Sequence, residues 1–212
     1  MKRFVAAAAV ATLGLGLANA STTVFEETWD LDASTNGAVR NFNGFANWTV
    51  TDGFVDLVPD GAFFLRCNGG TGGCLDSDGS MASASGMTIE TNQIFSFDAG
   101  RAYTLSVTFS GNQRGGSDTL NFEIAGLLDE FVPNIAASAP FTTMSYTFTP
   151  TLDTLARIMI SLPGPLDFVG PILDDVRLTV AGGTNPIPVP AALPLFLAGA
   201  GAFGAVKRRK AG

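Results

Sequence analysis

The sequence contains no histidine and has little positive charge in its central part. Without histidine, the Ser-His-Asp and Cys-His catalytic arrangements and all histidine-ligated metal sites are excluded. Between Ser21 and Pro190 the only cations are six arginines, against nineteen acidic residues, which gives a formal charge of −13. Nucleic acids and anionic lipid surfaces are bound through clustered positive charge. The composition therefore argues against both partners and suits cations or neutral glycans.

Residues 1–20, MKRFVAAAAVATLGLGLANA, have the composition of a signal peptide. Lys2 and Arg3 form a charged start, an apolar stretch follows, and Ala18-Asn19-Ala20 matches the small-x-small cleavage pattern. The apolar stretch is short for a transmembrane helix. We predict export through the Sec machinery and cleavage before Ser21, so that residues 1–20 lie outside the folded domain.

Only two cysteines are present, Cys67 and Cys74, in the segment CNGGTGGC. The glycines between them allow the chain to bend back on itself. An exported protein meets an oxidising compartment, where such a pair forms a disulfide by default. A redox pair or a metal site is the alternative, although the sequence has no CxxC motif and no second pair of thiols. We predict a Cys67–Cys74 disulfide.

No segment of residues 21–184 shows a convincing helical period, whereas alternation with period two recurs. The segment WTVTDGFVDLVP indicates a hairpin with Asp52-Gly53 at its turn. Short strands separated by frequent turns predict an all-β fold, an antiparallel β-sandwich of the jelly-roll type. The residues expected to share apolar faces are Tyr103, Leu105, Val107 and Phe109; Leu120, Phe122 and Ile124; Met144, Tyr146 and Phe148; and Ile158, Ile160 and Leu162.

The C-terminal part differs from the rest of the chain. Residues 185–190 form a short proline-rich linker, residues 191–206 carry no charge, and residues 207–212 contain four basic side chains. As a helix, residues 191–206 would extend about 24 Å, a marginal length for a hydrocarbon core of about 30 Å. The basic tail would stay in the cytoplasm, which leaves the domain outside the inner membrane. We predict a transmembrane helix over residues 191–206.

The order of these parts resembles the VPLPA-type branch of the PEP-CTERM sorting signals, with IPVPAALP here in place of VPLPAALP. The resemblance implies recognition by an exosortase, followed by release or attachment at the cell surface. It also implies an inner-membrane-anchored precursor with a periplasmic domain. The matching motif residues are Val189, Pro190, Ala191, Ala192, Leu193 and Pro194.

The domain itself resembles the galactose-binding-like jelly rolls that include many carbohydrate-binding modules. The matching segments are ETWD near the start, LDSDGS at 75–80, AGRAYTLSVTFSGNQRG at 99–115 and GPILDDVRLTV at 170–180. The resemblance implies a structural Ca²⁺ between the first and last strands.

The last expected strand contains an acidic residue in its apolar phase. Asp174 alternates with the apolar residues of PILDDVRLTV and should point inward, whereas Asp175 should face solvent. A buried carboxylate needs a cation or several hydrogen-bond donors. Combined with the Ca²⁺ that the resemblance implies between the first and last strands, this predicts a site made by Asp174 with Glu26 or Glu27, completed by backbone carbonyls. The alternative is that Asp174 accepts hydrogen bonds from backbone N–H groups.

Two loops contain candidate polar groups. Asp76–Ser80 begins like a calcium loop but fails the EF-hand pattern, because its glycine comes at the fourth position, and a plain Asp-rich turn is the alternative. In GNQRGG, the side chains of Asn112, Gln113 and Arg114 would hydrogen-bond a sugar, with Tyr103, Trp29 or Trp48 stacking on it. The alternative is a turn in which Arg114 pairs with Asp118 or another acid.

No P-loop or dinucleotide fingerprint is present, and nothing singles out two carboxylates as a glycosidase pair. We therefore expect an exported, surface-sorted, non-catalytic protein that binds or organises extracellular polysaccharide. A structural matrix or biofilm protein without a ligand is one alternative, and a glycosidase or other hydrolase is the second.

Overall fold

The computed structural model describes residues 21–81, 83, 86–164 and 167–182. Residues Ala20–Ala181 form one compact unit. The expected signal peptide, linker, sorting motif and transmembrane segment lie outside the described residues. None of the helices in the described ranges is long and apolar enough to cross a membrane.

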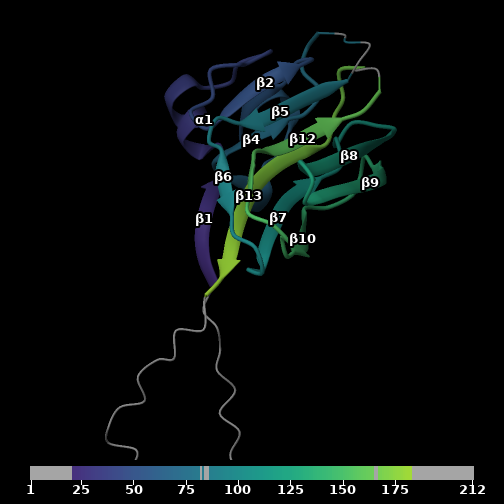
Figure 1. The fold of residues 1–212 in the computed structure, drawn as a ribbon. Helices are drawn as coiled ribbons and strands as arrows, with labels where there is room; N and C mark the ends of the chain where they lie inside the picture. The colour runs from purple at the N-terminus through teal and green to yellow at the C-terminus, as the bar shows by residue number, and fades with distance from the viewer. Residues whose placement is uncertain (1–20, 82, 84–85, 165–166, 183–212) are drawn as a thin grey trace, which may run out of the picture. The chain divides into compact units, whose positions relative to one another are not determined.

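The first sheet is built around β13, which joins distant parts of the sequence (Figure 1). Its strand order is β10-β7-β13-β4-β3, and β1 also pairs with β13. All of its pairs are antiparallel. Its strands are β1 (Ser21–Glu27), β3 (Asp56–Pro59), β4 (Gly73–Asp76), β7 (Tyr103–Ser110), β10 (Thr142–Phe148) and β13 (Ile172–Ala181).

The second sheet has the order β2-β5-β12-β8-β9, again antiparallel throughout. A short pair, β6 with β11, accompanies the two larger sheets. The antiparallel β-sandwich predicted from the alternation is thus the fold of the described residues. The remaining strands are β2 (Trp48–Asp52), β5 (Met87–Thr91), β6 (Phe95–Phe97), β8 (Ser117–Ile124), β9 (Leu128–Ala136), β11 (Thr154–Ala156) and β12 (Ile158–Leu162).

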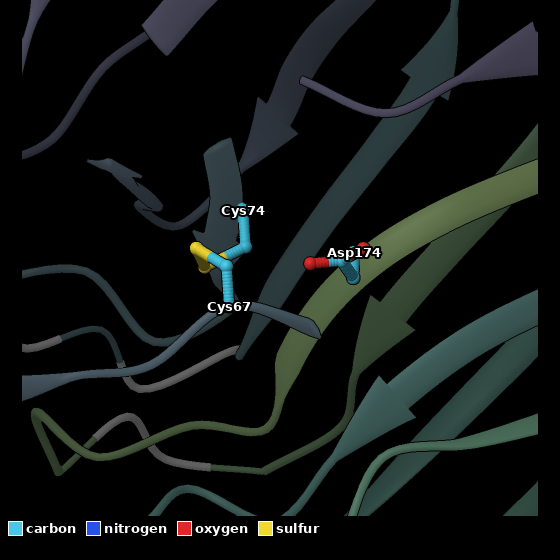
Figure 2. A group of neighbouring side chains, drawn as sticks. All are labelled: Cys67, Cys74 and Asp174. Carbon is cyan, nitrogen blue, oxygen red and sulfur yellow. A yellow bond between two sulfur atoms is a disulfide. The ribbon is translucent and has the colours of Figure 1, made fainter. Parts of the chain in front are cut away.

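The predicted disulfide is present and closes a small second core. Cys67 and Cys74 are bonded, with their Cα atoms 5.5 Å apart. Figure 2 shows the pair beside β4. Both cysteines are buried with Val58, Leu65 and Ile172, separately from the main cluster. The segment Asn68–Gly70 between them is one turn of 3-10 helix, η2, in which Gly69 takes a φ of 72° that favours glycine.

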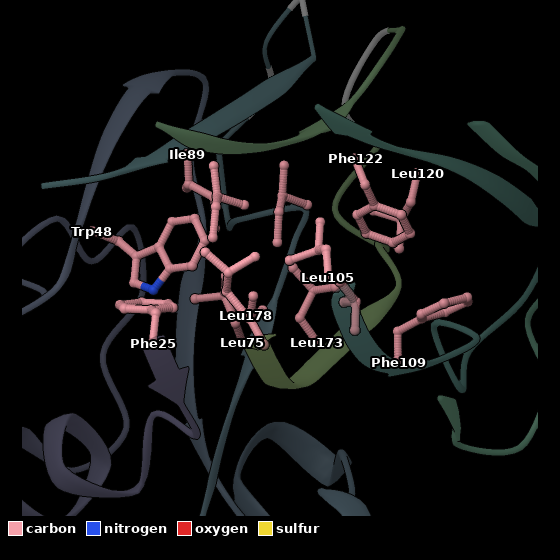
Figure 3. Packing of buried hydrophobic residues seen from close by; sticks show 14 of the residues in the cluster. Phe25, Trp48, Leu75, Ile89, Leu105, Phe109, Leu120, Phe122, Leu173 and Leu178 are labelled. Carbon is pink, nitrogen blue, oxygen red and sulfur yellow. The ribbon is translucent and has the colours of Figure 1, made fainter. Parts of the chain in front are cut away.

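The main core lies between the two sheets (Figure 3). Three of the four predicted apolar faces are buried completely, on β7, β8 and β12. On β10, Tyr146 and Phe148 pack against the core, whereas Met144 is exposed. β10 is an edge strand, so that prediction holds only in part.

The predicted hairpin around Asp52-Gly53 is wrong. The chain does turn there, with Gly53 at a φ of 64°. However, β2 pairs with β5 in one sheet, and β3 pairs with β4 in the other. Three consecutive residues of β3 are buried, because the disulfide-closed core covers its second face. The connection is therefore a crossover between sheets.

One helix interrupts the β-structure, contrary to the expectation of none. The seven residues of α1 (Asp30–Asn36) begin after Trp29, whose φ is 56°. Trp29 is fully buried, and Asp30 accepts a hydrogen bond from the backbone of Gly73. Tertiary packing, rather than a helical period, fixes this segment. A one-turn 3-10 helix, η1 (Ala62–Phe64), precedes the disulfide.

Four connections meet at the end of the sandwich away from the pairing of Ser21 with Ala181. We call this the loop end; it comprises residues 77–86, 111–116, 137–141 and 163–171 where these are described. Backbone hydrogen bonds join them: Gly111 N–H to Ala139 O, Ala137 N–H to Gly116 O, and Ser77 N–H to Pro171 O.

Candidate functional site

The predicted GNQRGG loop lies at the loop end, and Asn112 holds it together. Asn112 is 1% exposed, so it forms the inside of the loop rather than its surface. Its side-chain oxygen accepts the N–H groups of Arg114 and Gly115. Its amide nitrogen donates to Gly115 O and to Asp118 Oδ2. Every polar atom of this side chain is thereby used within the protein.

Gln113 joins the loop to the disulfide segment. Its Oε1 accepts the N–H of Arg66 at 2.9 Å, and its Nε2 donates to the carbonyl of Arg66 at 2.7 Å. The Gln113 side-chain amide thus makes the same pair of hydrogen bonds to Arg66 that a neighbouring strand would make with its backbone, although the two residues are 47 positions apart in the sequence. The backbone of Gln113 takes a φ of 60°, in the left-handed region, in the conformation in which its side chain reaches Arg66.

Arg114 forms an ion pair within the protein, as the turn interpretation predicted, and the acid is Asp76. Its guanidinium lies 3.1 Å from Asp76 Oδ2 and also donates to Phe168 O. Asp76 is 1% exposed. Burial raises the pKa of Asp76 to about 7, although Arg114 and the N–H of Asp78 act in the opposite direction. The segment Asp76–Ser80 is a buried turn, with Ser77 bonded to Pro171 and Ser80 to Asp56.

The connections 111–116 and 137–141, together with Arg66 and Cys67, form the walls of a groove of about 500 Å³. Exposed polar side chains, Arg66, Gln113 and Ser138, lie beside apolar ones, Pro140 and the partly buried Phe141. The groove is lined by Arg66, Cys67, Ser110, Gln113, Arg114, Ala137, Ser138, Ala139, Pro140 and Phe141. Gln113 and Arg114 were predicted from the sequence, whereas Arg66 and Phe141 were not, because neither belongs to a recognisable motif.

The three aromatic residues suggested for stacking are all in the core. Trp29, Trp48 and Tyr103 are at most 3% exposed. Trp48 packs edge-on against Phe25 inside the sandwich (Figure 3). Any sugar at the loop end would instead meet Phe141 in the groove, or Phe168, which is 51% exposed.

The predicted metal ligands are not brought together. Glu27 is buried at the end of β1, where its carboxylate accepts the N–H groups of Thr28 and Trp29 and the amide of Asn47. Glu26 forms an ion pair with Arg177 at 3.3 Å. Neither glutamate shares a ligand cluster with Asp174 among the described residues.

The inward direction predicted for Asp174 is wrong, because β13 contains a bulge. The register with β7 shifts between Leu173 and Asp175, so that Asp174 is an extra residue. Leu173, rather than Ile172, belongs to the main core. Asp174 is half-buried near the disulfide, and its Oδ2 accepts the N–H of Asn68 at 2.8 Å. The alternative prediction, in which Asp174 accepts a hydrogen bond from a backbone N–H group, therefore describes this residue.

Asp174 and the two sulfur atoms do lie within 4.8 Å of one another (Figure 2). Both sulfurs are committed to the disulfide, so they are not free thiolates for a metal ion. Burial raises the pKa of Asp174 to about 6; the bond from Asn68 acts against this shift, while Asp30 and Asp175 add to it.

No family model matches the chain, and no curated protein matches its sequence. Solved structures similar to it include the carbohydrate-binding module CBM6cm-2 of Cellvibrio mixtus lichenase 5A. That likeness has 13% identity and a TM-score of 0.37, over 67% of this chain and 95% of that one. The CBM22-1-GH10 modules of Clostridium thermocellum xylanase 10B have 18% identity and a TM-score of 0.46. The match covers 76% of this chain and 29% of that one.

A Stig cyclase, Fisc, from Fischerella sp. is about equally similar, with 15% identity and a TM-score of 0.47, over 77% of this chain and 99% of that one. All three likenesses have TM-scores below 0.5. Fold alone does not fix function. Function has to be argued from the side chains at the loop end.

Proposed function

We propose that residues 21–182 form an exported, non-catalytic module that binds extracellular polysaccharide in the groove at the loop end. The observation that carries the proposal is the mixed lining of this groove. Arg66 and Ser138 offer exposed hydrogen-bond donors beside the apolar surface of Pro140 and Phe141. Sugars present hydroxyl groups at their edges and C–H groups on their faces, so they require both kinds of surface.

The groove is also firmly built, which favours binding without a large ordering cost. The disulfide fixes one wall, and the paired bonds between Gln113 and Arg66 fix its neighbour. The charge of −13 on the domain disfavours strongly acidic glycans, so neutral polysaccharides are the proposed ligands.

Glycan-array screening followed by calorimetry tests the proposal. Arg66→Ala should weaken binding about tenfold, which corresponds to about 1.4 kcal/mol. Ser138→Arg should abolish it by filling the groove. Arg101→Ala is the matched control, because Arg101 also forms an exposed 2.9 Å ion pair, with Asp98, but does not line the groove.

Retention of full affinity by Ser138→Arg would place the ligand elsewhere on the domain. Absence of binding to every glycan would favour the structural matrix protein. Turnover of a polysaccharide, abolished by one Asp or Glu substitution, would establish a hydrolase instead.

The route to the surface belongs to the same proposal and rests on the sequence. Residues 1–20 direct export, and an exosortase-type enzyme processes the chain at the motif Val189–Pro194. Mass spectrometry of the surface-released protein should find Ser21 as the first residue and no peptide from residues 205–212. Recovery of AVKRRKAG on the mature protein would leave a plain membrane anchor.

A further inference from the structure

A second cavity at the loop end, of about 220 Å³, is lined by acidic and neutral polar groups. Three aspartates contribute to it from three separate segments: Asp78 in the connection after β4, Asp118 near the start of strand β8, and Asp167 in the connection before β13. The other lining residues are Ser117, Thr119, Asn134, Leu162, Pro163 and Gly164.

Asp78 is the unusual member of this group. It is 2% exposed, and its Oδ2 accepts the N–H of Asp167 at 2.7 Å. Its Oδ1 is also buried and makes no hydrogen bond of normal geometry, although the backbone N–H groups of Phe168 and Val169 also face this carboxylate. A buried carboxylate oxygen without a partner costs free energy, so a native protein normally supplies a donor or a cation.

None of the six arginines in the described part of the chain is left for this purpose. Five of the six arginines of the domain form ion pairs elsewhere, and Arg40 lies over the ring of Phe63. Of the described residues that line the cavity, none is basic.

We propose that Asp78, Asp118 and Asp167 form a binding site for one Ca²⁺ ion. All candidate donors are oxygen atoms, from carboxylates, the Asn134 amide and the Ser117 and Thr119 hydroxyls. Oxygen donors select hard cations over zinc or copper. Ca²⁺ takes six to eight oxygens in flexible geometry, whereas Mg²⁺ demands a tight octahedron. A roomy cavity with candidate ligands from two connections and the strand β8 favours Ca²⁺.

Coordination requires a small adjustment of the exposed members. In the described part of the chain, the oxygens of these three carboxylates are not all within 4.8 Å of one another. Asp78 is fixed by its surroundings, whereas Asp118 is half-buried and Asp167 is exposed. The proposal requires the Asp118 and Asp167 side chains to rotate toward Asp78 Oδ1, with water completing the shell, and Asp118 would then give up its hydrogen bond from Asn112. The site is independent of polysaccharide binding and distinct from the sequence-predicted one at Asp174.

The test measures melting temperature and calorimetric binding, with the full-length chain and with residues 21–182, after removal of metal by EDTA. Ca²⁺ at a hundredfold excess over Kd should raise Tm by about 5–10 °C. Mg²⁺ should give a smaller shift. Asp78→Asn and Asp118→Asn should each abolish the Ca²⁺-dependent shift and the calorimetric signal, even if either variant has a higher Tm without metal.

Two asparagine substitutions serve as controls. Asp98→Asn makes the same charge change at an exposed position outside the cavity, and Asp174→Asn removes the sequence-predicted ligand. Both should retain the Ca²⁺ shift. The proposal is overturned if the unmodified protein shows no Ca²⁺ shift and no binding heat. It is also overturned if Asp78→Asn keeps the shift or if Asp174→Asn removes it.

Discussion

The Cys67–Cys74 disulfide should be a major contributor to the stability of this domain, and its effect can be isolated. The two cysteines are seven positions apart and almost fully buried. On the chain-entropy relation, closing a loop of about eight residues stabilises by about 2.5 kcal/mol. For a domain of this size that corresponds to a fall in Tm of about 5–10 °C when the bond is reduced.

The assay is differential scanning calorimetry of oxidised and reduced protein. Because the sulfur atoms are buried, the chain is unfolded and refolded with a reductant, and free thiols are counted by mass labelling. The variant Cys67→Ala/Cys74→Ala should melt at least as low, since losing two buried sulfurs also leaves a small cavity. The reductant should not change the Tm of this cysteine-free variant.

The disulfide also fixes the groove, because residue Arg66 lies beside Cys67 and pairs with Gln113. Reduction should therefore weaken glycan binding at temperatures where the domain is still folded. A Tm that changes by less than about 2 °C on reduction would refute the entropic reasoning. The small core around Val58, Leu65 and Ile172 would then hold the loop closed by packing alone.

Two further substitutions follow from local geometry. Gly111→Ala should destabilise by about 3 kcal/mol in thermal melts, because its Cβ would lie 2.0 Å from Ala136 O; the control Gly115→Ala meets nothing within 4 Å and should be neutral. Asp174→Asn should stabilise by about 1 kcal/mol at pH 7, since the carboxylate is only partly shielded. The folded pKa of Asp174, about 6, exceeds the ordinary 3.8, so its stabilising effect is present below pH 3.8 and is lost as pH rises through 6. The variant should flatten that fall in pH-dependent melts, and an unchanged profile would show that Asp174 does not titrate as stated.

Strands with strict alternation could be predicted from the sequence, and those without it could not. The faces on β7, β8 and β12 are set by local period two, and all three are buried as expected. β3 could not be assigned in this way, because a second core covers its other face. On β13 the bulge at Asp174 changes the phase midway, and no local residue pattern announces it.

The loop end shows the same distinction for function. The sequence identified the GNQRGG loop, because glycines and amides in a turn are locally recognisable. It could not identify the partners: Arg114 reaches Asp76 across 38 positions, and Asp78 accepts the N–H of Asp167 across 89. Such contacts depend on which strands are neighbours, and that is a property of the topology.

The acidic composition alone does not show which carboxylates are paired, because the pairing depends on these distant contacts. A charge of −13 predicts repulsion but does not say where it concentrates. Beside the loop end, Asp76 is paired with Arg114, whereas Asp78 keeps one buried oxygen without a hydrogen bond. In the described part of the chain the other arginines are engaged elsewhere, so no arginine side chain compensates the carboxylates of Asp78, Asp118 and Asp167. The proposed Ca²⁺ would compensate these carboxylates at neutral pH, whereas a proton on Asp78 would do so without metal, and the asparagine variants separate these two states.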